Sequence, residues 1–444
     1  MKHIFLLILV YGIRLSFLSA QENANEFGFP DSTYRVSEII VVGNETTKSY
    51  VIENEMSLAV GNTVTYDAVR YDRERIYNLR LFTKVDIDVV PTSADEASVI
   101  VRVNERWYFY PYPVVGLKDR SLNKIYYGAG LIHNNVGGRN VLLYGQFAAG
   151  YDPFISFGYV DPLFGFDHKI FFSMHLSFSE QRNRSLVSLK NGPNFDERRW
   201  GWDVSLGKRY SLFSTVTTTL EYLNLHVSDN RAGRTLSPNG HDHFFSFAAA
   251  YRYDTRDLAD YPRIGTFFSA SVSKIGIFDN VVDYERYNLD IRRYIPIVFD
   301  MVAAGRMFTS IAGGGAIPNY GHTFFGYADR IRGYFSKILE GEQIAGSTVE
   351  LHVPLIKSNY IRIDQIPIEQ FRDIRYEMNL AFFADAGSTW YRKEAVALNK
   401  FYSGYGVGIH LNLAYSAVGR IEYAIPYGNP LSKGEIIFDI GAAL

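Results

Sequence analysis

The sequence predicts a mainly β protein, a 16-stranded transmembrane antiparallel β-barrel that follows one small α/β domain. The 444 residues include 33 Tyr, 32 Phe and 37 Gly, a composition that suits many strands and turns. From Trp107 onward, apolar and polar residues alternate with a period of two, as strands with two different faces require. The segments with this alternation number 16, and single-chain bacterial barrels have an even number of strands.

Composition excludes several other classes of protein. After the N-terminus, no apolar run reaches the roughly 20 residues that a transmembrane helix needs. The 45 Lys and Arg residues against 47 Asp and Glu residues give a net charge of -2, which gives no support for nucleic-acid binding. The absence of cysteine excludes disulfides, thiolate metal sites and cysteine nucleophiles.

The first 20 residues are predicted to be a secretory signal peptide, followed by a linker over residues 21–32. Lys2 and His3 precede the apolar stretch Ile4–Leu18, and Ser19-Ala20 supplies small residues for cleavage. The alternative is a buried N-terminal element. An exported, strand-rich, cysteine-free chain of bacterial type is a candidate for the outer membrane.

Residues 33–105 are predicted to form the separate α/β domain, in the order strand, helix, helix, strand, strand. Val36–Val42 is an apolar strand, and Thr47 and Thr65 are candidate N-caps of the two helices. Two segments rich in alternating valine follow and complete the domain.

Residues 106–444 are predicted to form the barrel, because the connections between strands sort by length. Long connections on one side and short turns on the other are typical of outer-membrane barrels, whereas a soluble sandwich is the alternative for alternating strands. Two connections, 255–264 and 357–375, are exceptions because they are long on the short-turn side. The predicted strands lie near 107–117, 123–134, 139–150, 153–161, 167–179, 199–210, 213–228, 242–254, 265–276, 284–295, 298–311, 345–356, 376–386, 403–413, 416–426 and 434–443, and the long connections are 180–198, 229–241, 312–344 and 387–402.

Short motifs in the predicted barrel, among them Ile331-Arg332-Gly333-Tyr334 and the Phe383, Asp385 and Gly387 of one strand, resemble those of the BamA/TamA/FhaC superfamily of outer-membrane insertases and secretion pores. The longest loop, 312–344, contains Ile331-Arg332-Gly333-Tyr334, which is similar to the family's [VI]RG[FY] motif. Strand 13 contains Phe383, Asp385 and Gly387, which match the family's F-x-D-x-G. Further matching segments are Asp254–Asp257 with Pro262–Gly265, Asn135–Asn140, the glycines 404, 406 and 408, and Tyr423–Pro426. Residues 33–105 resemble a single periplasmic POTRA domain.

The resemblance implies that the long loop folds into the barrel and that Arg332 meets Asp385. A guanidinium in a polar lumen gains from a bidentate carboxylate. Placing the charged Asp385 side chain against lipid costs free energy, so Asp385 is expected to point inward. Phe383, two residues away on the same strand, is expected to point inward with it. Gly333 permits close backbone passage, and Tyr334 supplies a rigid contact. The alternative is that Arg332 is an ordinary solvated loop residue.

The first and last predicted strands suggest a weak seam in the barrel. Strand 1 contains Pro111 and Pro113, which cannot donate ladder hydrogen bonds, and strand 16 contains Gly441. Such a seam opens more easily to a client strand that pairs by β-augmentation. The alternative is that these residues only mark frayed barrel ends.

No catalytic residue, metal site or cofactor is predicted. His241-Asp242-His243 is the only His-x-His segment and falls in a predicted surface loop, where an ordinary polar loop is the better interpretation. His410 and Asn412 share the inward face of strand 14 and are interpreted as polar lumen residues. The sequence contains no G-x-S-x-G and no phosphate-binding G-x-x-x-x-G-K-[ST], so we do not expect an enzyme.

Three functional hypotheses follow. The first is an assembly factor that inserts client proteins into the bacterial outer membrane, with the POTRA domain in the periplasm. The second is a translocation pore for one dedicated secreted protein, and the third is a passive or structural barrel. The expected partners are outer-membrane lipid, unfolded outer-membrane or secreted clients, and periplasmic accessory proteins that bind the POTRA domain, with no nucleic acid.

Overall fold

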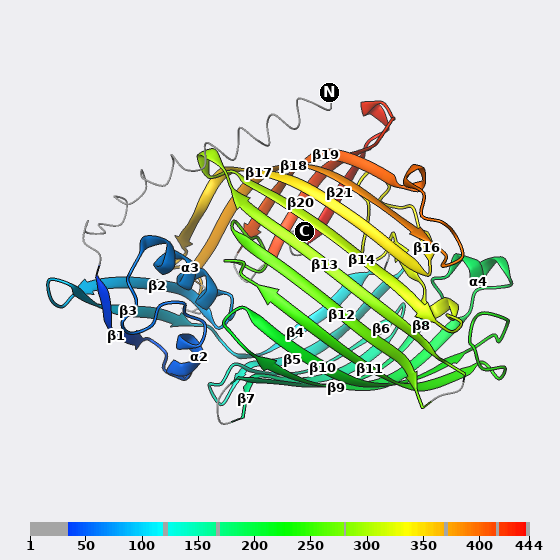
Figure 1. Ribbon diagram of the computed structural model, residues 1–444, viewed down its shortest axis with the longest axis horizontal. Helices are drawn as coiled ribbons and strands as arrows, with labels where there is room; N and C mark the ends of the chain where they lie inside the picture. The colour runs from blue at the N-terminus through cyan, green and yellow to red at the C-terminus, as the bar shows by residue number, and fades with distance from the viewer. Residues whose placement is uncertain are drawn as a thin grey trace.

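The chain forms a small α/β domain at one end of a large curled antiparallel sheet (Figure 1). The computed structural model describes residues 34–118, 123–165, 169–278, 281–367, 372–413 and 417–440. The predicted signal peptide, the linker and Gly441 lie outside the described residues. Within the described ranges, no helix is long and apolar enough to cross a membrane.

The N-terminal domain has the predicted order of elements. They are β1 (Arg35–Val42), α2 (Ser49–Glu53), α3 (Tyr66–Tyr77), β2 (Phe82–Pro91) and β3 (Glu96–Glu105). The strands form a mixed sheet in the order β1-β3-β2, in which β1 and β3 are parallel. Both outer strands, β1 and β2, therefore have a free edge within this sheet.

The two predicted helix caps differ in outcome. Thr65 caps α3, because its hydroxyl accepts a hydrogen bond from the backbone N–H of Ala68 at 3.2 Å. The cap predicted at Thr47 is wrong, since Lys48 holds that position without a side-chain hydrogen bond. The Thr47 hydroxyl instead contacts Tyr108 at 3.0 Å and accepts from Asn135 at 2.9 Å. Its role is to join the domain to the start of the barrel.

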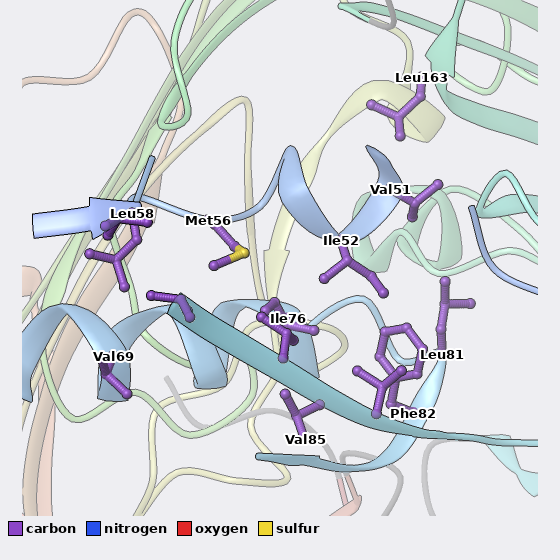
Figure 2. Packing of buried hydrophobic residues seen from close by; sticks show 14 of the residues in the cluster. Val51, Ile52, Met56, Leu58, Val69, Ile76, Leu81, Phe82, Val85 and Leu163 are labelled. Atoms are coloured by element: carbon purple, nitrogen blue, oxygen red, sulfur yellow. The ribbon is translucent and has the colours of Figure 1, made fainter. Parts of the chain in front are cut away.

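The core of the N-terminal domain lies between the sheet and the two helices (Figure 2). Ile52 of α2, Ile76 of α3 and Val85 of β2 are almost fully buried there. Leu163, which comes from the barrel, belongs to the same cluster and approaches Val51 in Figure 2. The apolar core therefore continues across the boundary between the two parts.

The second part is a 16-stranded antiparallel sheet, and all 16 predicted segments occur in order. The strands are β4 (Phe109–Leu117), β5 (Ile125–Val136), β6 (Val141–Gly150), β7 (Phe154–Phe164), β8 (Ile170–Arg182), β9 (Asp196–Arg209), β10 (Ser214–Val227), β11 (His241–Asp254), β12 (Gly265–Ile277), β13 (Tyr284–Pro296), β14 (Val302–Gly314), β17 (Gln343–Arg362), β18 (Asp373–Trp390), β19 (Tyr402–Leu413), β20 (Ala417–Pro426) and β21 (Glu435–Ile440). Successive strands pair throughout, except that β14 pairs directly with β17.

The largest errors in the predicted boundaries lie at hairpins. The connection predicted at 357–375 is shorter in the structure, because β17 and β18 extend into it and pair as far as Arg362 and Asp373. The strand predicted from residue 298 begins at Val302, since Val298–Asp300 forms a tight turn with Phe299 at φ 58°. That backbone conformation ends a strand.

The two faces of the sheet differ in the way a membrane barrel requires. Outward side chains are apolar and exposed, including Val115 at 70% and Phe438 at 65%. Inward positions hold buried polar groups, including Glu377, His410 and Glu422. An apolar outer face meets lipid and a polar inner face lines the lumen.

Helix α3 docks on the connection between β11 and β12. The Asn78 side chain donates to the backbone carbonyl of Asp257 at 2.6 Å and accepts from the backbone N–H of Ala259 at 2.9 Å. Arg80 pairs with Asp260 at 2.7 Å. The unexpectedly long 255–264 connection thus forms the platform on which the N-terminal domain sits.

A buried ion pair adds to this docking and predicts its pH dependence. Glu74 of α3 accepts from Arg375 of β18 at 2.7 Å. Burial alone would raise the pKa of Glu74, but the guanidinium groups of Arg375 and Arg73 outweigh burial and lower the pKa to about 2. The ionised Glu74 therefore stabilises the docking of the N-terminal domain. This stabilisation is complete above the ordinary carboxyl pKa of 4.5 and is lost as the pH falls towards 2.

Glu74→Gln is therefore expected to weaken docking near neutral pH, by about 3 kcal/mol at most from the pKa difference. The wild-type chain should undock only on acidification below about pH 4.5, whereas the variant should be undocked more often near neutral pH and should lack this acid-dependent loss. Spin labels on engineered cysteines in the domain and the barrel measure the separation. Glu96→Gln, a change at an exposed acidic position of the same domain, is the control. Equal label distances in all three proteins at pH 7 would contradict the assigned role of Glu74.

Candidate functional site

The long connection between β14 and β17 carries the predicted motif and folds against the inner wall. It contains the short hairpin β15 (Thr323–Phe325) and β16 (Leu339–Gly341). We call Ile331–Tyr334 the loop latch. Ile331 is 2% exposed and packs with Phe325 and Ile344, and the Tyr334 ring lies edge-on to Tyr402 at 5.1 Å. The two apolar residues of the latch thus fix the position of Arg332 between them.

Two glycines allow the latch to approach the wall closely. Gly333 adopts φ +93°, and a Cβ there would lie 2.9 Å from the backbone of Ile425 and Pro426. On β19, a Cβ at Gly404 would lie 1.9 Å from the carbonyl oxygen of Arg332. Any larger residue at position 404 would therefore push the latch away from the barrel wall.

The guanidinium of Arg332 lies among three carboxylates. It donates to both oxygens of Asp385, from Nε at 2.8 Å and from Nη2 at 2.7 Å, and the backbone N–H of Arg332 donates to the same group at 3.0 Å. Nη1 lies 2.7 Å from Glu350 Oε1 and 2.8 Å from Glu422 Oε1. The guanidinium carbon is 3.7 Å from the centre of the Phe383 ring. All three carboxylate side chains are at most 5% exposed.

Strand register explains why these groups meet. Glu350 of β17 pairs with Phe383 of β18, and Phe383 pairs with Gly406 of β19. Because Gly406 has no side chain, the Phe383 ring lies over it, and a Cβ there would be 2.6 Å from that ring. Asp385 lies two residues beyond Phe383 and shares its inward face. Phe383 is thereby a flat platform for the guanidinium.

The structure brings together Arg332, Phe383 and Asp385, and it adds two acids that are absent from the residues predicted for the site. Glu350 and Glu422 lie on strands far apart in the chain, so sequence spacing gives no sign that they meet. The one available signal was that Glu350 and Glu422 are acidic residues within predicted strands, on the faces expected to point inward. Gly387, the last residue of the matched F-x-D-x-G segment, lies under the Phe325 ring of the loop, with 2.4 Å to a Cβ placed there.

The same loop also reaches the last strand. The backbone N–H of Phe335 donates to Glu435 of β21 at 2.7 Å. The Phe335 ring packs beside Phe383, Ala424 and Ile437. The residue after the latch therefore supports the inner face of β21.

The sheet begins at β4 and ends at β21, and no backbone pairing joins these two strands in the residues that the structure describes. Pro111 and Pro113 lie on β4 opposite Leu131 and Ala129 of β5. Two prolines separated by one residue lack their N–H groups on the same edge of a strand, and the ladder with β5 occupies the other edge. The free edge of β4 is therefore short of donors at two positions.

The residues around His241 have structural partners. His241 lies 3.0 Å from the amide oxygen of Asn224. Asp242 accepts from the backbone N–H groups of Leu236 and Ser237 and from the hydroxyl of Tyr320, at 2.8–2.9 Å. The segment falls at the start of β11 and orders the adjacent loop.

These features define a class: an outer-membrane β-barrel with a periplasmic α/β domain and a loop fastened inside the lumen. The chain belongs to the Omp85 superfamily, whose domain matches residues 135–443, and residues 34–106 match the surface antigen variable number repeat, the POTRA family. The barrel therefore lies in the outer membrane and the POTRA domain in the periplasm.

A curated relative agrees with this membership. The chain is 24% identical over 428 residues to the outer membrane protein assembly factor BamA of Nitratidesulfovibrio vulgaris, covering 90% of this chain and 49% of that protein. It thus spans about half the length of this curated relative.

Solved structures show the same fold at low identity. BamA from Haemophilus ducreyi lacking POTRA domains 1–3 aligns with TM-score 0.54 and 17% identity, over 92% of this chain and 84% of that one. CdiB from Escherichia coli aligns with TM-score 0.55 and 10% identity, over 99% and 96%.

Proposed function

We propose that this protein is an assembly factor that inserts client proteins into the outer membrane at the seam between β4 and β21. The observation that carries the proposal is that the sheet ends on these two strands without a ladder between them in the described residues. An unpaired strand edge presents backbone donors and acceptors to an incoming strand. The client would add to the β21 edge, where no proline interrupts the described segment Glu435–Ile440.

The prolines of β4 support this asymmetry. A closed ladder needs N–H donors along both edges, and Pro111 and Pro113 remove two from the free edge of β4. A ladder across the seam would therefore lack the hydrogen bonds that N–H groups at these two positions would donate. A client strand with a complete set of donors and acceptors would compete well for β21.

The loop latch would hold the inner side of this seam. Arg332 is fastened to β17, β18 and β20 through its three carboxylates, and Phe335 is bonded to Glu435 of β21. A latched loop would keep β21 in register with β20 while its other edge is free. No bond chemistry and no nucleotide are part of this mechanism.

The POTRA domain would supply the periplasmic contact. Its β1 and β2 edges are free within the domain's sheet, and either could pair with an extended segment of a client or an accessory protein. Its docking on the 255–264 connection would place that segment near the barrel entrance.

Depletion of the protein followed by quantitative comparison of the outer-membrane proteome tests the proposal. We expect many barrel proteins to fall together, with their unfolded forms accumulating in the periplasm. Loss of a single secreted protein, with barrel proteins unchanged, would instead favour a dedicated translocation pore. An unchanged proteome would favour a passive barrel.

A further inference from the structure

A second polar cluster shares Glu350 with the carboxylates that bind Arg332 and adds two histidines that the mechanism above does not use. It consists of Glu350, His352 and His410, all of them buried, and one donor atom from each lies within 4.8 Å of the other two. We propose that this cluster binds one divalent transition metal ion of the zinc class. The inference is independent of the proposed function.

The pairing of the strands places the three side chains of the cluster next to small residues on the neighbouring strands. Glu350 and His352 lie two residues apart on the inward face of β17. His352 pairs with Ala381 of β18, and Ala381 pairs with Gly408 of β19. Because these two neighbours are small, there is room above them for side chains from either side. His410 enters this space two residues from Gly408.

Glu422 is a fourth group at the same place. It pairs with Gly408, and a Cβ on that glycine would lie 2.6 Å from the Glu422 side chain. Its Oε1 is 3.1 Å from His410 Nε2, while Glu350 Oε2 is 2.6 Å from His352 Nε2. Each glutamate therefore lies between Arg332 on one side and a histidine on the other.

Charge balance favours a divalent cation. Among the described residues, the carboxylates of Glu350, Asp385 and Glu422 have Arg332 as their one arginine or lysine partner. Three carboxylates and one guanidinium leave two negative charges in a buried site, which is costly without compensation. One divalent ion supplies the missing charge.

The donor chemistry of these side chains fits the same ion. Two imidazoles with one or two carboxylates form a common zinc ligand set. His352 is 1% exposed, yet its Nδ1 has no hydrogen-bond partner among the described residues. His410 Nδ1 is 3.2 Å from the hydroxyl of Tyr261, a contact that orients the ring. The Tyr261 ring also stacks on His352 with centres 4.8 Å apart, and it closes the site on the side of the 255–264 connection.

The test is metal analysis of the purified full-length protein carrying a tag without histidine. After equilibration with zinc and gel filtration, we expect about one tightly bound equivalent, as for a three-ligand protein site. His352→Gln and His410→Gln should each reduce bound zinc at least tenfold. His243→Gln, which removes the sole His-x-His segment, should leave it unchanged. A heat-dependent gel shift shows which variants keep a folded barrel.

A spectroscopic measurement on the wild-type protein keeps the test independent of variant folding. Replacing zinc with cobalt(II) should give the visible absorption of a low-coordinate site with nitrogen and oxygen ligands. Absence of bound zinc in the folded wild-type protein would overturn the proposal. The proposal would also be overturned if the folded His352→Gln and His410→Gln variants both kept their zinc while His243→Gln lost it.

Discussion

Replacing Arg332 with alanine is expected to release the long loop from the barrel wall and to abolish assembly activity. The variant leaves three buried carboxylates without their guanidinium, and removal of one partner from a buried ion pair costs about 3–5 kcal/mol. The latch also loses its contact with the Phe383 ring. Limited proteolysis of the loop and a client-insertion assay measure the two consequences.

A second substitution distinguishes an ion pair from two independent residues. Asp385→Ala should also loosen the loop, but less than Arg332→Ala, because Glu350 and Glu422 still bind the guanidinium. The double variant should be less harmful than the sum, with a coupling of about 0.5–3 kcal/mol. Strictly additive effects on proteolysis and insertion would show that the two residues act separately.

Lys337→Ala is the matched control for charge. Lys337 lies in the same loop with an exposed side chain, and its ammonium lies over the Tyr402 ring at 4.1 Å. An exposed contact of this kind contributes about 0.5–1 kcal/mol. The control should therefore keep the loop protected and the activity close to that of the wild-type protein.

The architecture was accessible from the sequence because membrane barrels obey two simple regularities. A period of two in hydrophobicity marks each strand. Long connections follow alternate strands, which indicates the end of the barrel at which each connection lies. Both regularities weaken where strands leave the membrane, which is why the ends of β17 and β18 were misplaced. Thr47 illustrates a different limit: its partners, Tyr108 and Asn135, belong to the next part of the chain, and local sequence favours a helix cap.

The site was only partly accessible for a related reason. Arg332 and Asp385 stand in motifs that resemble a known family, so they were predicted as a pair. Glu350, Glu422 and the histidine cluster depend on the register of four adjacent strands, and a shift of one residue would turn each side chain to the other face. No spacing in the sequence specifies that register.

The seam gives the second large prediction: cross-linking β4 to β21 should abolish insertion while leaving the barrel folded. Cysteines at Val115 and Phe438 face outward and are exposed. The chain has no cysteine of its own, so a short bifunctional thiol reagent joins these two alone. If clients pair with β21 at an open edge, a covalent bridge across that edge blocks them.

The control pair keeps one of the two cysteines and moves the other to the opposite side of β21. Ile421 of β20 pairs in register with Phe438, so cysteines at these two positions join strands that are already hydrogen-bonded. This bridge leaves the seam open. It should have little effect on insertion, and it controls for loss of the Phe438 side chain and for the reagent.

The most direct measurement is the rate at which each cross-linked protein, in lipid vesicles, inserts an unfolded outer-membrane barrel client, before and after the bridge is reductively cleaved. Gel mobility after denaturation verifies that each bridge has formed. We predict that the Val115–Phe438 bridge reduces the rate to that of empty vesicles and that cleavage restores it, whereas the Ile421–Phe438 bridge leaves it unchanged. Full insertion with the Val115–Phe438 bridge in place would contradict a lateral seam and direct attention to a route through the lumen.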